Sequence, residues 1–166
     1  MKSPTGPFDY FRETMERLQG DGILLVAGDP PNPMTIGWAT IGTIWHRPVM
    51  TVLVRPTRYT FHLMEEASDF SVCVLPDKFE KHLAFCGTKS GKDHDKIKVC
   101  GFTLKPGKMI STPYIAESGY HFECRTIHRH KLDPDRLDES ISKRFYPKKD
   151  FHTVYYGEIV GAFGRD

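Results

Sequence analysis

The sequence has no closely spaced pair of cysteines. Its four cysteines, Cys73, Cys86, Cys100 and Cys124, are far apart, and no two of them form a C-x-x-C motif. This absence argues against a zinc ribbon and against a thioredoxin-type dithiol. We therefore expect free thiols and a soluble protein in the reducing environment of the cytoplasm.

The sequence also lacks a strong net charge and a long apolar run. It has 23 Lys and Arg against 21 Asp and Glu, which gives no general reason to expect nucleic-acid or membrane binding. The longest stretch without these four residue types, Pro30–His46, is interrupted by prolines, glycines and threonines, so it does not predict a membrane span. The first eighteen residues include Arg12, Glu13, Glu16 and Arg17 in place of the apolar run of a signal peptide.

What the chain does contain is enough apolar sequence for one core. Its 166 residues, 39% of them hydrophobic, predict a single domain over 1–166. Short strands with a few helices between them indicate a mainly β fold, a β-barrel decorated by helices. Helices are predicted over 8–18, 57–66, 77–86, 93–99 and 135–145, and strands over 23–27, 34–45, 49–55, 69–75, 120–130 and 153–163.

Carboxylates are missing from a long window of the sequence. Pro30–Met64 contains no Asp or Glu but does contain Arg47, Arg55 and Arg58. A barrel core would explain this, because carboxylates are rarely buried. The alternative is an anion site, since Arg55–Thr60 places two guanidiniums and two hydroxyls at a strand-to-helix junction. Arginine and the free N–H groups of a first helical turn both bind phosphate.

A second candidate for anion binding is the loop Gly87–Asp93. It differs from the phosphate loop of nucleotide hydrolases, because three residues separate its glycines and Asp93 follows the lysine. It still offers backbone N–H groups, the Ser90 hydroxyl and Lys92, with Lys96 nearby. The alternative is an ordinary solvated loop in which Asp93 caps the next helix.

A third feature is the segment Thr35–Thr40. On one regular strand, Ile36, Trp38 and Thr40 would share a face, and Gly37 would let a flat surface approach the backbone. Trp38 is then either a core residue or a neighbour of a planar heterocycle.

Two other groups of reactive side chains were considered. His128 and His130 would point to one face of a strand, and His121 or His152 could join them as metal ligands. No carboxylate or cysteine stands at a confirming spacing, so we predict no metal site but an exposed or interface histidine cluster. For Cys86 and Cys100 the alternatives are redox-active thiols or buried, bystander cysteines, and the lack of a paired partner in the sequence favours the second.

The segments together resemble the flavin reductase-like, FMN-binding split-barrel family, especially its flavoredoxin-like branch. The resembling residues are 32–38, 55–60 and 86–96, together with the late strand 152–160, and the similarity extends from about residue 21 to residue 160. The resemblance implies a mainly β split barrel of Greek-key type with helices.

The resemblance also implies a cofactor and its contacts. FMN would carry the chemistry, so no catalytic side chain is expected. Trp38 and Thr40 would lie near the ring, and Ser90, Gly91 and Lys96 would close the phosphate side. The full set of implied cofactor-binding residues is Asn32, Thr35, Trp38, Thr40, Arg55, Arg58, Tyr59, Thr60, Ser90, Gly91, Asp93, Lys96 and His152.

The implied partners are a second copy of the chain, with the flavin near the interface, and an electron donor such as NAD(P)H or a redox partner protein. Free flavin, oxygen or a protein would accept the electrons. A rival from another class is a non-catalytic barrel that binds a phosphorylated ligand or nucleic acid through Arg55, Arg58, Lys89 and Lys92. Base stacking would need aromatic residues among these cations, and the near-neutral charge argues against nucleic acid.

Overall fold

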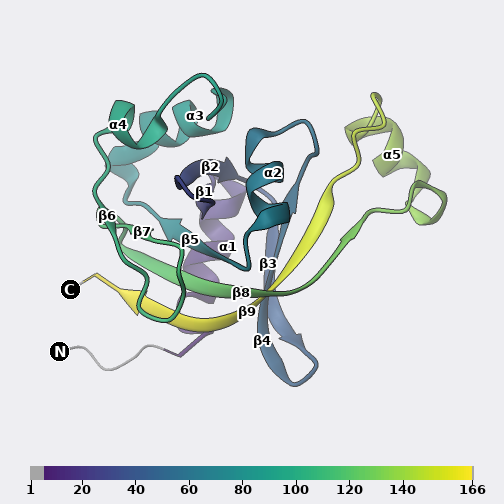
Figure 1. The fold of residues 1–166 in the computed structure, drawn as a ribbon. Coiled ribbons are helices and arrows are strands. Elements are labelled where there is room, and N and C mark those ends of the chain that lie inside the picture. Colours follow the sequence, from purple (N-terminus) through teal and green to yellow (C-terminus); the bar gives the residue numbers. More distant parts are fainter. Residues whose placement is uncertain (1–5, 166) are drawn as a thin grey trace.

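The computed structural model describes residues 6–165 and shows one strongly curved antiparallel sheet surrounded by helices (Figure 1). Its seven strands are ordered β2-β1-β5-β8-β9-β4-β3, and two short strands form a separate ribbon, β6-β7. Within residues 6–165 the edge strands β2 and β3 do not pair, so the barrel is split. The strands are β1 Ile23–Ala27, β2 Asn32–Ile36, β3 Ala39–Ile44, β4 Arg47–Val54, β5 Asp69–Val74, β6 Leu104–Lys105, β7 Tyr114–Ile115, β8 Tyr120–Lys131 and β9 Thr153–Gly164.

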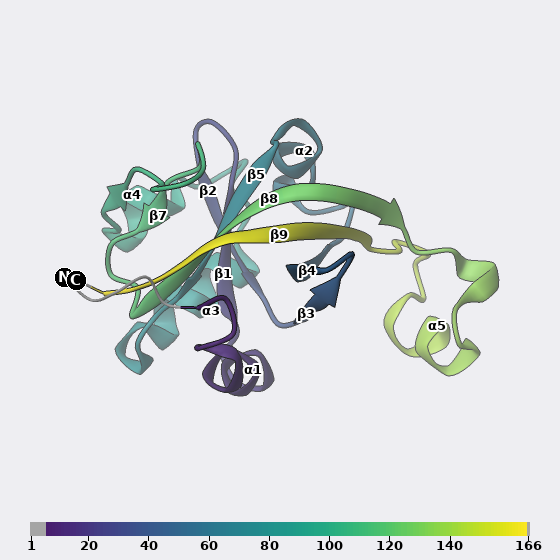
Figure 2. The ribbon, with the colours of Figure 1, turned by 90° about the horizontal axis from the view of Figure 1, so that it is seen from below.

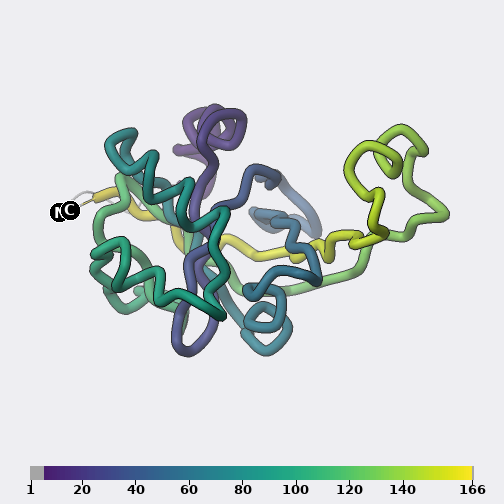
Figure 3. Tube along the Cα trace, turned by 90° about the horizontal axis from the view of Figure 1, so that it is seen from above, coloured from purple at the N-terminus to yellow at the C-terminus, as the bar shows by residue number. Residues whose placement is uncertain are grey.

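The helices lie at the ends and sides of this sheet. They are α1 Phe11–Gln19, α2 Tyr59–Glu66, α3 Glu80–Thr88, α4 Lys96–Cys100 and α5 Glu139–Phe145, with 3-10 turns η1 Asp77–Phe79 and η2 Pro134–Arg136. In Figure 3, α3 and α4 lie side by side at one end of the molecule, and α5 lies at the other end. No helix of the described residues is long and apolar enough to cross a membrane. The predicted class, a mainly β split barrel with helices, is confirmed.

The strand predicted over 34–45 is in fact two strands at opposite edges of the sheet. β2 pairs with β1, whereas β3 pairs with β4 at the far edge. The chain changes edge at Gly37 and Trp38, which belong to neither strand. The alternation that placed Ile36, Trp38 and Thr40 on one face is therefore wrong, because it cannot continue through this corner.

The side chains of β1 are buried on both faces of the sheet. On one face they pack in the same cluster as residues of α3, and this packing fixes the position of α3. Leu25 points to the barrel interior, where it belongs to the same core cluster as Phe122 and Tyr155. Its neighbour Leu24 belongs to the opposite cluster, with Leu83 of α3. Burial on both faces explains why β1 is continuously apolar.

β8 and β9 form the long ribbon that was predicted from residues 120–130 and 153–163. Gly157 allows β9 to curve closely over the core, because a Cβ there would come within 2.5 Å of the Phe70 ring. Beyond the body of the sheet, the ribbon carries residues 131–150, including α5, away from the barrel (Figure 2). We call residues 131–150 the arm.

Three helix starts differ from the predictions. α4 is capped by Asp95, which accepts a hydrogen bond from the Lys98 N–H at 3.1 Å, and not by Asp93. The side chain of Asp77 does not cap a helix but pairs with Arg17. α5 begins only at Glu139, since residues 134–136 form a 3-10 turn. For α4 and α5 another aspartate nearby, Asp95 and Asp138, provides the cap, whereas no side chain caps α3.

Glu123 fixes the loop after β6 although it is fully buried. Its carboxylate accepts hydrogen bonds from the N–H groups of Lys108 at 2.8 Å and Met109 at 2.6 Å, and lies 3.2 Å from Nε2 of His121. Burial by itself would raise the pKa of Glu123, but these hydrogen bonds outweigh it and lower the pKa below its ordinary value.

We predict that Glu123→Gln lowers the free energy of unfolding at pH 7 by about 2 kcal/mol, because an amide cannot replace a carboxylate that accepts several hydrogen bonds. The lowered folded pKa means that this stabilisation is present above the unfolded pKa of about 4.3 and is lost as the pH falls through the folded value. Urea unfolding should show the difference at pH 7 and a smaller one below about pH 4. Glu139→Gln, on the exposed face of α5, is the control; an equal loss there would contradict the prediction.

Candidate functional site

Two adjoining hollows lie between β2, the end of β4, the start of α2 and the loop after α3. The first, which we call the strand hollow, has a volume of about 220 Å³ and is lined by Met34, Thr35, Ile36, Gly37, Trp38, Leu53, Arg55, Arg58 and His152. The second, the loop hollow, has a volume of about 170 Å³ and is lined by Met34, Thr57, Arg58, Tyr59, Thr60, Thr88, Lys89, Ser90, Gly91 and Lys96. Because Met34 and Arg58 line both, the hollows are neighbours.

The strand hollow is bordered by aromatic rings and by the corner between β2 and β3. Trp38 at this corner is 41% exposed, and its ring lies 5.0 Å from the ring of Phe145 and 5.2 Å from that of His152. Thr35 donates a hydrogen bond to the Leu83 carbonyl at 2.6 Å, which attaches this wall to α3. The result is a flat-sided hollow that is partly open beside Trp38.

Arg55 holds the arm against the strand hollow. Its guanidinium donates to the Phe145 carbonyl at 2.9 Å, forms an ion pair with Asp150 at 3.0 Å and lies over the Tyr146 ring. Arg55 lines the strand hollow but not the loop hollow. Arg58 lines both hollows, so the two arginines share the strand hollow while only Arg58 reaches the loop hollow.

His152 forms a buried part of the same wall. Its Nδ1 lies 2.6 Å from the hydroxyl of Tyr146, and among residues 6–165 its Nε2 has no hydrogen-bond partner. Burial, and then the nearby Arg55, lower the pKa of His152 to about 4. The imidazole is therefore neutral at pH 7, with one ring nitrogen available to the hollow.

The loop hollow is built by close contact between the loop after α3 and the start of α2. Gly91 lies directly on Asn32 and Tyr59: a Cβ at this position would be 2.1 Å from the Asn32 side-chain oxygen and 2.7 Å from the Tyr59 ring. Asn32 in turn donates to the Thr60 hydroxyl at 3.0 Å. No side chain caps the N-terminus of α2, and its first two residues, Tyr59 and Thr60, line this hollow.

Two cations of the loop hollow are held by neutral acceptors. Lys96 is 2% exposed and donates to the carbonyls of Cys86 at 2.9 Å and Pro33 at 3.1 Å. Arg58 donates to the Gly87 carbonyl at 2.9 Å. Burial lowers the pKa of both side chains, that of Lys96 to about 8, to which the charge of Arg58 also contributes. In the part of the chain that the structure describes, neither cation forms an ion pair with a carboxylate.

Most of the predicted site residues are brought together. Asn32 supports the loop hollow through Thr60, and the others that line one or both hollows are Thr35, Trp38, Arg55, Arg58, Tyr59, Thr60, Ser90, Gly91, Lys96 and His152. Thr40 is not among them: it lies beyond the corner on β3, where its hydroxyl faces that of Thr51 at 2.5 Å. Asp93 is exposed in the turn after Gly91 and lines neither hollow.

The sequence analysis missed the residues that the arm contributes. Phe145 contacts Trp38 and Tyr146 contacts His152, so the arm supports two residues that line the strand hollow. The available signal was the aromatic pair itself, but nothing in the local sequence of the arm indicates where it packs.

The histidines considered as metal ligands are dispersed. His128 and His130 lie near each other beside Tyr156 on the outside of the ribbon, while His121 contacts Glu123 and His152 contacts Tyr146. Among the described residues, no group of three or more His, Cys, Asp or Glu side chains is arranged to hold a metal ion.

Comparisons with known proteins identify the family of this chain. The family model described as "Flavin reductase like domain" matches residues 15–166. An uncharacterized protein of Archaeoglobus fulgidus is 30% identical over 138 residues, which cover 82% of this chain and 68% of that protein.

Solved structures share the fold. The flavoredoxin of Methanosarcina acetivorans has a TM-score of 0.68 and 25% identity, covering 87% of this chain and 68% of its own. The flavoredoxin of Desulfovibrio vulgaris (Miyazaki F) has a TM-score of 0.68 and 22% identity, with 87% and 69% covered. The NADH:FAD oxidoreductase of Streptomyces globisporus has a TM-score of 0.67 and 20% identity, with 98% and 86% covered. This chain belongs to the flavin reductase-like family of flavin-related oxidoreductases.

Proposed function

We propose that this chain is an FMN-binding oxidoreductase that holds the phosphate in the loop hollow and the ring system in the strand hollow. The observation that supports this most directly is the pair Lys96 and Arg58, two partly or fully buried cations without a carboxylate partner among residues 6–165. A buried charge without a counter-ion is costly, and a bound phosphate would compensate both.

The other residues of the loop hollow fit a phosphate as well. The Ser90 hydroxyl, the Thr60 hydroxyl and the uncapped start of α2 add hydrogen-bond donors, and Gly91 leaves the backbone accessible. The strand hollow fits a flat ring, since it is bordered by Trp38 and by the neutral His152. The two hollows together reach the size of ordinary ligand pockets, about 300 Å³ or more.

Bound FMN would supply the hydride and electron transfer, so the chain needs no catalytic side chain of its own. The residues of the chain bind, orient and partly cover it: Arg58 and Lys96 fix one end, and the Trp38–Phe145 pair borders the other. The opening beside Trp38 would admit NAD(P)H or another electron carrier, and electrons would then pass to free flavin, oxygen or a protein.

Two roles are compatible with this site. The similar solved structures include both flavoredoxins and an NADH:FAD oxidoreductase. In an electron-transfer protein FMN stays bound through turnover, whereas in a flavin reductase the reduced flavin leaves as product. Retention of FMN after anaerobic reduction distinguishes them.

The proposal predicts that purified protein takes up FMN and quenches its fluorescence. Riboflavin, which has the same ring but no phosphate, should bind more weakly by about tenfold or more, because it cannot pair with the two cations. Anaerobic addition of NADH or NADPH to the FMN-loaded protein then identifies the donor by bleaching of the flavin. Protein that is isolated without FMN and does not bind added FMN would exclude the proposed function.

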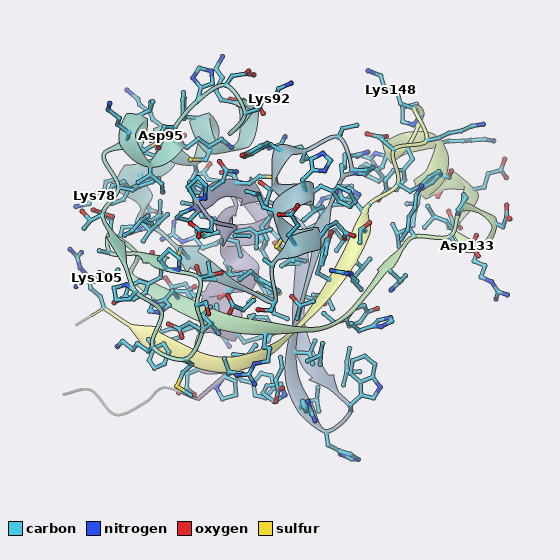
Figure 4. The ribbon with its side chains drawn as sticks, viewed as in Figure 1. Lys78, Lys92, Asp95, Lys105, Asp133 and Lys148 are labelled. Carbon is cyan, nitrogen blue, oxygen red and sulfur yellow. The ribbon has the colours of Figure 1, made fainter. Side chains whose placement is uncertain are left out.

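Lys96→Met tests the phosphate contact. We expect FMN affinity to fall by about 10- to 100-fold, the effect of losing a charge-assisted hydrogen bond, with little change for riboflavin. Lys92→Met is the matched control, since Lys92 lies at the outer edge of the loop between α3 and α4 and lines neither hollow (Figure 4). Equal loss for both ligands would mean that Lys96 acts through the fold and not through the phosphate.

The lowered pKa of Lys96, about 8, predicts a pH dependence of FMN affinity. Phosphate binds the protonated ammonium, so affinity should be high below this value and fall as the pH rises through it. The fall should be seen in FMN titrations from about pH 7 to about pH 10 and be absent in Lys96→Met. A pH-independent affinity in the wild-type protein would contradict the role of this ammonium.

The proposal includes a homodimer. The tip of the β3–β4 hairpin exposes 57% of Trp45, which lies against Tyr156 and His128 on the outside of the ribbon. An aromatic cluster of this kind is typical of contact surfaces between proteins. We predict that sedimentation gives the mass of a dimer and that Trp45→Glu shifts it toward the monomer. A wild-type monomer at all concentrations would contradict this part of the proposal.

A further inference from the structure

The packing of α3 against α4 brings two cysteines together that are distant in the sequence. Cys86 on α3 and Cys100 at the end of α4 have their sulfur atoms 3.9 Å apart. Cys86 is buried and Cys100 is partly exposed, and both are free thiols. A disulfide would require these sulfur atoms to approach to about 2.05 Å.

The pair encloses the segment that lines the loop hollow. Ser90, Gly91 and Lys96 all lie between the two cysteines in the chain. Lys96 is also attached to Cys86 directly, because its ammonium donates to the Cys86 carbonyl at 2.9 Å. A change in the distance between α3 and α4 would therefore move residues of the loop hollow.

We propose that Cys86 and Cys100 are a redox-active dithiol, which hydrogen peroxide converts to a disulfide that alters the loop hollow. The site takes a small peroxide as its oxidant. Its effect on FMN rests on the proposed function, whereas formation of the disulfide does not.

The reaction consumes two thiols and one hydrogen peroxide and forms one disulfide and two waters. The Cys100 sulfur, which is the more exposed, attacks one peroxide oxygen, the O–O bond breaks, and a sulfenic acid and one water form. The Cys86 sulfur then attacks the Cys100 sulfur, the S–O bond breaks, and the oxygen leaves as a second water with the remaining thiol proton. The two sulfurs together lose two electrons, and the peroxide gains them.

The surroundings of Cys86 and Cys100 set the rate at which these thiols are oxidised. Burial raises the pKa of both thiols, that of Cys86 to about 12, while the charge of Lys96 opposes this rise. Because the thiolate is the reactive form, oxidation should be slow at pH 7 and faster as the pH rises. Cys73 and Cys124 are buried, and among the described residues neither has another cysteine beside it, so they serve as internal controls.

The first test is mapping of disulfides by mass spectrometry after treatment of the folded full-length chain with hydrogen peroxide. We expect one disulfide between Cys86 and Cys100, a loss of two free thiols, and reversal by dithiothreitol. Cys100→Ser should abolish it and Cys124→Ser should leave it unchanged. Four free thiols after prolonged treatment at alkaline pH, or a disulfide through Cys73 or Cys124, would overturn the proposal.

The second test measures the consequence for the loop hollow. The disulfide should raise the melting temperature by about 5 °C, because it closes a loop in the unfolded chain. FMN affinity should differ between the reduced and oxidised protein by about fivefold or more, and saturating FMN should shift the dithiol–disulfide equilibrium by the same factor.

The two proposals fail in different ways. If the chain does not bind FMN, the mapped disulfide and the melting temperature still decide whether the dithiol exists. If the disulfide forms but FMN affinity is equal in both states, the dithiol does not act on the loop hollow and that part of the inference is wrong.

Discussion

The candidate site depends on two positive charges, the buried Lys96 and the half-buried Arg58, which have no carboxylate partner within residues 6–165. Lys96 is held by the carbonyls of Cys86 and Pro33, and Arg58 by that of Gly87, so both are fixed in place but not neutralised. Burial in the core is one reason why residues 30–64 contain no Asp or Glu. This arrangement of the two cations gives a second reason. An acidic side chain facing Arg58 would remove the charge that makes the loop hollow suitable for an anion.

Local sequence patterns predicted most helices and strands of the fold, but they did not predict the corner between β2 and β3. The apolar and threonine-rich residues of 34–45 favour extended backbone, and they do form strands. Whether one strand or two form depends on which edge of the sheet each half joins, and only long-range pairing decides that. Because one continuous strand was predicted, Thr40 was expected on the same face as Trp38. In the structure Thr40 lies outside both hollows, whereas Trp38 lies at the corner and lines the strand hollow.

The roles of Arg55 and Cys100 show the same limit at the level of single side chains. Arg55 was grouped with Arg58 because both lie at the predicted strand-to-helix junction, yet its partners Phe145 and Asp150 come from the arm. Cys100 has no cysteine close in the sequence, yet helix packing brings Cys86 to it. Sequence spacing describes neighbours within one element, whereas these contacts join separate elements, and only the resemblance to a family could anticipate any of them.

The arm extends away from the barrel, whereas the two hollows are lined by residues outside the arm. It connects two strands whose pairing is already fixed along the body of the sheet, and Arg55 and Trp38 are its attachments at the strand hollow. Insertions, deletions and substitutions in the arm can therefore accumulate during evolution without disturbing the cradle for the phosphate. A change in the arm would then reach the strand hollow, through Arg55 and Trp38, before it reached the loop hollow.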